Sequence, residues 1–138
     1  MSPGRDFLAL IARILLAVVF IVSGYGKIGG FDGTVAAIAG KGIPLPQVAA
    51  AITILIELGG GILLVLGWKT RWLGLIFFLW LIPTTALFHD FWAAPPDQHM
   101  AQQIHFMKNL AIMGGMLMVY AFGPGRLSID GDGRGRET

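Results

Sequence analysis

Hydrophobic residues gather into four long runs along the chain, separated by short polar stretches. The runs cover residues 7–28, 48–66, 72–88 and 104–122. A helix rises about 1.5 Å per residue, so about 20 residues cross the roughly 30 Å hydrocarbon core of a bilayer. Each run approaches that length. The pattern therefore predicts an all-α fold, in which residues 1–125 form an integral membrane four-helix bundle.

The composition supports a membrane protein. Hydrophobic residues make up 55% of the chain and charged residues only 13%, with a mean hydropathy of +0.72. Soluble domains usually carry about 25% charged residues. The chain has no cysteine, which excludes disulfides, thiolate chemistry and thiolate-bound metal clusters on this chain.

The polar connections suggest how the helices join. Residues 69–71 form a very short connection, which predicts that the second and third helices are antiparallel neighbours. In residues 29–47, Phe31, Val35 and Ile38 recur at helical spacing and predict a short interfacial helix. Residues 126–138 are polar and rich in glycine, so a disordered cytoplasmic tail is predicted there.

The basic residues indicate the orientation in the membrane. Short loops rich in Lys and Arg stay on the cytoplasmic side. With four spans, seven basic residues fall on the side of both termini and three on the other; the seven are Arg5, Arg13, Lys69, Arg71, Arg126, Arg134 and Arg136. Both termini are therefore predicted to be cytoplasmic. Because the basic residues are scattered at helix ends, nucleic-acid binding is not expected.

Glu57 is the most informative polar residue within a span, because an ionised group in hydrocarbon costs at least about 2.5 to 3.5 kcal/mol unless it is paired or hydrated. Several small residues share its helical face. The face consists of Ala50, Thr53, Glu57, Gly60, Gly61 and Leu64. Small residues let another helix approach closely, so this face is predicted to point into the bundle.

Other polar groups are expected in the outer half of the membrane with Glu57. We predict a candidate ligand site there, formed by Lys27, Glu57, His89, Asp90, His105, Lys108 and Asn109. Arg13 is expected to snorkel to the inner surface. Trp80, in the middle of the third span, is interpreted as a packing residue. Pro83 is interpreted as a proline that the helix tolerates, and a kink that frees a backbone carbonyl near Trp80 is the alternative. No metal-binding motif is found.

Two interpretations of the charged residues stay open. In the first, the outer half binds a quinone or similar lipophilic aromatic, with Lys108 or His105 donating to a carbonyl oxygen and Glu57 exchanging a proton. In the second, Glu57 and Lys108 are only a structural ion pair. Haem ligation by His89 and His105 is a further hypothesis, and a transporter is conceivable.

A set of landmark residues recurs in a characteristic order along the chain: Arg13, Phe20, Ser23, Gly24, Lys27, Gly42, Pro44, Pro46, Glu57, Gly60, Gly61, Gly67, His89, Asp90, Phe91, Trp92, Phe106, Lys108, Asn109, Gly123, Pro124, Gly125, Ser128, Ile129 and Asp130. In this order the landmarks resemble those of the DoxX family of small bacterial inner-membrane proteins. The resemblance implies a four-helix membrane bundle in the bacterial inner membrane.

The resemblance also implies a redox-associated role. Family members are linked to a thiosulfate:quinone oxidoreductase, to thiol and oxidative-stress enzymes, and to responses to quinone-like or catechol-like compounds. For this chain that implies a quinone-linked oxidoreductase subunit, or a non-catalytic scaffold for a partner oxidoreductase. No covalently bound cofactor is implied, and a quinone is the expected diffusible one. The lipid bilayer, a partner redox protein and further copies of the chain are the expected partners.

Overall fold

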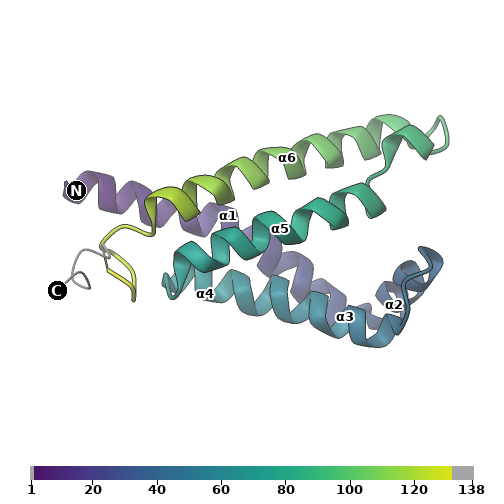
Figure 1. Ribbon diagram of the computed structural model, residues 1–138, viewed down its shortest axis with the longest axis horizontal. Coiled ribbons are helices and arrows are strands. Elements are labelled where there is room, and N and C mark those ends of the chain that lie inside the picture. Colours follow the sequence, from purple (N-terminus) through teal and green to yellow (C-terminus); the bar gives the residue numbers. More distant parts are fainter. Residues whose placement is uncertain (1, 132–138) are drawn as a thin grey trace. The chain divides into compact units, whose positions relative to one another are not determined.

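The computed structural model describes residues 2–131, and every regular element within them is a helix (Figure 1). Four helical stretches are long and apolar enough to cross a membrane: Pro3–Gly29, Pro46–Leu66, Thr70–Ala93 and His99–Phe122. The predicted all-α class with four membrane-spanning helices is confirmed. Each observed helix begins a few residues before the hydrophobic run that predicted it, since helix starts are set by capping groups and prolines as well as by hydropathy.

The described chain divides into two compact units, the first with residues 2–70 and 124–131 and the second with residues 71–123. In the first unit, α1 (Pro3–Gly29) begins at Ser2, whose hydroxyl accepts a hydrogen bond from the Arg5 N–H. A short helix, α2 (Phe31–Gly40), follows at the position where an interfacial helix was expected. The second span consists of α3 (Pro46–Ile54), the π-helical turn η1 (Leu55–Gly59) and α4 (Gly60–Leu66).

Small residues hold α1 against the second span. A β-carbon at Gly61 would lie 2.8 Å from the Ile21 side chain and 3.4 Å from the Ala17 carbonyl, so only glycine fits at this contact. The face of the second span that carries Glu57 is internal, as predicted: Ala50, Thr53, Glu57 and Leu64 are all buried. This close contact brings polar groups of α1 within reach of Glu57.

Arg13 of α1 is buried, with 2% of its surface exposed, and does not snorkel as expected. Its guanidinium donates to the carbonyls of Leu64 and Val65 at 3.0 and 2.8 Å, and to those of Pro124 and Leu127. The carbonyls of Leu64 and Val65 lie in the last turn of α4, where the helix dipole favours a cation. Arg13 therefore ties α1 and α4 to the segment that follows the last helix.

Residues 124–131 make specific contacts with the rest of the first unit. The Asp130 carboxylate accepts hydrogen bonds from the backbone N–H groups of Lys69 and Thr70 at 2.9 and 2.7 Å, and so caps the start of the next helix. The Asp6 carboxylate accepts from the Arg126 N–H at 3.0 Å. We call residues 124–130 with these contacts the C-terminal clasp. Residues 132–138 of the predicted tail lie outside the described residues.

The second unit is a helical hairpin of α5 (Thr70–Phe88) and α6 (His99–Phe122), joined through the short 3-10 helix η2 (Phe91–Ala93). The two long helices run side by side (Figure 1) and meet closely at Gly74, where a β-carbon would lie 2.8 Å from the Met116 carbonyl. At the far end of α6, Arg71 donates to the carbonyls of Tyr120 and Ala121. The last turn of α6 is thus capped by a cation.

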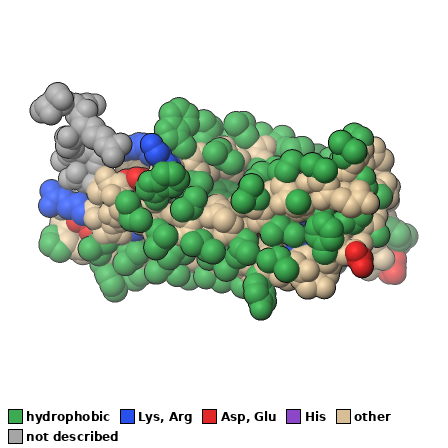
Figure 2. All heavy atoms as spheres, turned by 90° about the horizontal axis from the view of Figure 1, so that it is seen from below, with side chains coloured by type: hydrophobic (Ala, Val, Ile, Leu, Met, Phe, Trp, Pro, Cys, Tyr) green, Lys and Arg blue, Asp and Glu red, His purple; other side chains and the backbone are tan. Residues whose placement is uncertain are grey.

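Large apolar side chains cover much of the exterior, and Figure 2 shows hydrophobic side chains spread over one face of the molecule. Leu15, Val22 and Leu55 are each more than 60% exposed. Water-soluble proteins rarely expose large continuous apolar surfaces, whereas such surfaces match the hydrocarbon of a bilayer. The exterior agrees with the membrane class predicted from the sequence.

Candidate functional site

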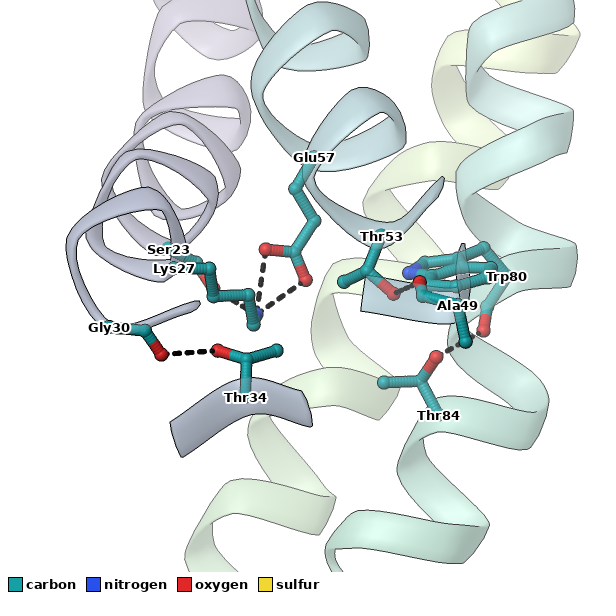
Figure 3. A network of polar contacts seen from close by, with 9 residues as sticks. All are labelled: Ser23, Lys27, Gly30, Thr34, Ala49, Thr53, Glu57, Trp80 and Thr84. Carbon is teal, nitrogen blue, oxygen red and sulfur yellow. Dashed lines mark hydrogen bonds and ion pairs between the residues drawn. The ribbon is translucent and has the colours of Figure 1, made fainter. Parts of the chain in front are cut away.

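The first unit contains an ion pair between Lys27 of α1 and Glu57 of η1 (Figure 3). The Lys27 ammonium lies 2.9 Å from Oε1 and 2.8 Å from Oε2 of Glu57, and donates a third hydrogen bond to the Ser23 hydroxyl at 2.8 Å. An ammonium has three donors, so this one has an acceptor for each. The Glu57 side chain is 8% exposed and that of Lys27 is 29% exposed.

Local backbone structure places this pair. Glu57 is the middle residue of the π-helical turn, and π-helical turns within α-helices are rare and frequent at functional sites. Gly24 lies one turn before Lys27 on α1, where a β-carbon would come within 2.7 Å of the Leu58 nitrogen. The absence of a side chain at Gly24 lets α1 approach the turn, which brings Lys27 to the carboxylate.

The ion-pair partner of Glu57 differs from the one expected in the structural-pair hypothesis. Glu57 forms its ion pair with Lys27, where the structural-pair hypothesis assigned Lys108. Lys108 is an exposed residue of α6. The depth in the membrane that hydropathy indicates is compatible with either lysine as the partner of Glu57. The close approach of α1 at Gly24 brings Lys27 to the carboxylate.

The second unit brings together the two predicted histidines. The rings of His89 and His105 stack with centroids 5.1 Å apart and planes inclined by 28°. His89 Nδ1 and the Gln102 side-chain oxygen are 2.9 Å apart. The stacked rings turn their faces, not their ring nitrogens, toward each other, an arrangement that does not favour shared ligation of a haem iron.

Asn109 and Asp90 complete the predicted residues of the second unit. The Asn109 amide donates to the buried Thr85 hydroxyl at 3.1 Å, which links α6 to α5. Asp90 is half-buried and precedes η2. The seven predicted residues thus fall into two groups, one in each unit: Lys27 with Glu57, and His89, Asp90, His105, Lys108 and Asn109.

An aromatic cluster near η2 was not predicted from the sequence. Phe91 makes edge-on contacts with the rings of Trp92, His99 and Phe106, at centroid distances of 5.3, 5.5 and 5.2 Å. Such contacts each add about 0.5 to 1.5 kcal/mol beyond area burial. The cluster fixes the loop beside His89 and so supports the histidine pair. The density of aromatic residues at positions 91, 92 and 106 was the only sequence signal for it.

Four helices able to span a membrane and a part-buried ion pair in the first unit define a class of small integral membrane proteins. The comparisons with known proteins identify the family. The DoxX family model matches residues 8–90. The chain belongs to the DoxX family. No solved structure matches the chain significantly.

The relatives include two bacterial inner-membrane proteins. The chain is 40% identical to the inner membrane protein YphA of Escherichia coli (strain K12) over 94% of this chain and 92% of that protein. It is also 40% identical to the inner membrane protein YqjF of the same organism, over 94% and 95%. A Bacillus subtilis (strain 168) protein named "Putative oxidoreductase CatD" is 37% identical over 59% of this chain and 60% of its own length.

Proposed function

We propose that this DoxX-family membrane protein has a redox-associated role and binds a quinone or a similar lipophilic aromatic in the outer half of the bundle. The observation that supports this proposal is the ion pair between the half-buried Lys27 and the buried Glu57 of the π-helical turn. Ionisable groups within a membrane span are expensive and typically functional. A carboxylate buried within a span could exchange the proton that accompanies quinone reduction.

The relative CatD supports the redox part of the proposal through its name. We place this protein in the bacterial inner membrane, like YphA and YqjF, with both termini in the cytoplasm. The sequence has no nucleotide-binding or flavin-binding motif, so electrons would come from a partner redox protein or a diffusible carrier. The remaining candidate ligand groups are His89, Asp90, His105, Lys108 and Asn109.

A second candidate function is a non-catalytic subunit or scaffold for a partner oxidoreductase. The observation that favours it is the complete pairing of the Lys27 ammonium, whose three donors all have acceptors within the protein. An ion pair whose ammonium donors all have acceptors within the protein is compatible with a purely structural role, which is to fix the helices in register. Under this proposal the protein binds a partner protein in place of a small molecule, and Glu57 takes no part in proton exchange.

Ligand analysis distinguishes the two candidates. The protein is purified in mild detergent, and the lipophilic molecules extracted with it are identified by mass spectrometry. A quinone or related aromatic in stoichiometric amount, lost in Glu57→Gln and kept in Asp97→Asn, supports the first proposal; Asp97 is exposed and serves as the matched carboxylate control. Phospholipid alone, together with a co-purifying oxidoreductase, would favour the scaffold.

A further inference from the structure

Trp80 occupies an unusual position for tryptophan. The chain has four tryptophans, and the other three are exposed near helix ends: Trp68 (44%), Trp72 (63%) and Trp92 (60%). Those positions fit the membrane interface, where the indole N–H meets water or lipid headgroups. Trp80 is ten residues beyond Thr70 in α5, about 15 Å along the helix. A headgroup does not reach that depth.

The indole N–H of Trp80 has no hydrogen-bond partner among the described residues, although the nitrogen is buried. It is the single buried side-chain nitrogen or oxygen atom within residues 2–131 for which this is so. An unpaired polar group in hydrocarbon costs several kcal/mol. Buried tryptophans usually satisfy this donor, so the exception at Trp80 requires an explanation.

The neighbouring backbone of α5 does not supply an acceptor. The Trp80 carbonyl accepts a hydrogen bond from the Thr84 hydroxyl at 2.8 Å (Figure 3), so Thr84 uses its proton within the helix. The Thr84 oxygen retains lone pairs, and Trp80 and Thr84 are one helical turn apart on the same face. This face of α5 therefore carries one unused donor and one hydroxyl oxygen within the membrane-spanning helix.

We propose that the Trp80 indole N–H donates a hydrogen bond to a carbonyl oxygen of an aromatic ligand that packs against this face of α5, which makes Trp80 a ligand-binding residue. This inference rests on the proposed function and specifies the ligand as one with a ring carbonyl. A quinone has an acceptor oxygen attached directly to a flat apolar ring, so it satisfies the donor and also packs against the indole. A water molecule at the same place would leave several of its own hydrogen bonds unmade.

The test uses the full chain in lipid nanodiscs and decylubiquinone as the probe. Indole N–H signals are recorded by NMR after isotope labelling of tryptophan, and the Trp80 signal is assigned by its absence in Trp80→Phe. Decylubiquinone should shift the Trp80 signal in the direction of a stronger hydrogen bond. Its affinity, measured by calorimetry, should fall about tenfold in Trp80→Phe and stay unchanged in Trp72→Phe, at an exposed position.

The outcomes separate this inference from the proposed function. Binding of decylubiquinone with an unmoved Trp80 signal and equal affinity in Trp80→Phe overturns the role of Trp80 alone. Absence of binding to the unmodified protein overturns the quinone proposal and this inference together. Circular dichroism and thermal unfolding of ligand-free Trp80→Phe show whether this variant folds. The variant Thr84→Val removes the hydroxyl oxygen and keeps the indole. With decylubiquinone it should still show the shift of the Trp80 signal.

Discussion

Gly24 of α1 lies directly against Leu58 of the π-helical turn, so closely that a β-carbon at position 24 would be 2.7 Å from the Leu58 nitrogen and 3.2 Å from the Glu57 β-carbon. The approach of the two helices at this point determines whether Lys27 reaches Glu57. A single methyl group is enough to test it.

Gly24→Ala is therefore expected to destabilise the protein, by about 1 to 3 kcal/mol for an overpacked contact against backbone. The matched control is Gly26→Ala, two residues further along α1, where a β-carbon would meet nothing within 4 Å. Because alanine is the better helix former, the control should raise stability by about 0.5 to 1 kcal/mol. Thermal unfolding in detergent measures both; equal effects would contradict the close contact.

The Lys27–Glu57 pair should show strong coupling. Lys27→Met leaves a buried carboxylate without its partner and is expected to cost about 3 to 5 kcal/mol, whereas the double variant Lys27→Met with Glu57→Leu should recover most of this loss. Chemical unfolding of the single and double variants gives the coupling energy. Additive effects would show that the two side chains do not interact in the membrane.

Arg13 should be among the most sensitive positions for stability. Arg13→Met removes the guanidinium hydrogen bonds to four backbone carbonyls and is expected to cost more than about 3 kcal/mol. Hydrogen exchange followed by mass spectrometry should show faster exchange in residues 124–130, because the C-terminal clasp loses its anchor. Arg5→Met removes an exposed arginine of the same helix and should leave exchange in the clasp unchanged.

Asp130 should contribute as the cap of α5. Asp130→Ala removes the acceptor for two backbone N–H groups and is expected to lower the free energy of unfolding by about 1 to 2 kcal/mol. Asp130→Asn keeps an oxygen acceptor and should cost less. Asp97→Ala, at an exposed position, is the control and should lie within about 0.5 kcal/mol of the unmodified protein.

The orientation can be tested directly because the natural chain has no cysteine. Single cysteines are introduced at Gly4, in the first turn of α1, and at Asp97, between the last two spans. In intact cells, a membrane-impermeant maleimide should label Asp97→Cys and not Gly4→Cys, as the positive-inside rule predicts. The reverse pattern of labelling would place both termini outside.

The sequence predicted the helices well because long apolar runs have few alternatives to a membrane helix. It also predicted that the Glu57 face is internal, since small residues beside a carboxylate are informative about helix contact. It assigned Lys108 and not Lys27 to Glu57 because hydropathy gives the depth of a residue along a helix but not the direction in which neighbouring helices face. The π-helical turn was not predicted from the sequence.

The C-terminal clasp was missed for a different physical reason. Arg13 donates to backbone carbonyls. Because every residue has a carbonyl, the amino-acid sequence does not indicate which residues will be its partners. Glycine, polar residues and charge after the last helix indicated disorder, although Asp6 and Asp130 pair with backbone N–H groups across more than 60 residues of chain. Such contacts become visible only when the segments are seen together in the folded unit.

The contacts of Arg13 also determine when the first unit can complete its assembly during synthesis of the chain. Arg13 is synthesised early, whereas its acceptor at Pro124 lies 111 residues later. At translation rates of about 5 to 20 residues per second, the guanidinium waits roughly 5 to 20 s for that acceptor. During this time the first hydrophobic helix carries an arginine whose hydrogen bonds are incomplete. Arrival of the last segment then completes them, so the closing step of assembly comes only after all four helices have been made.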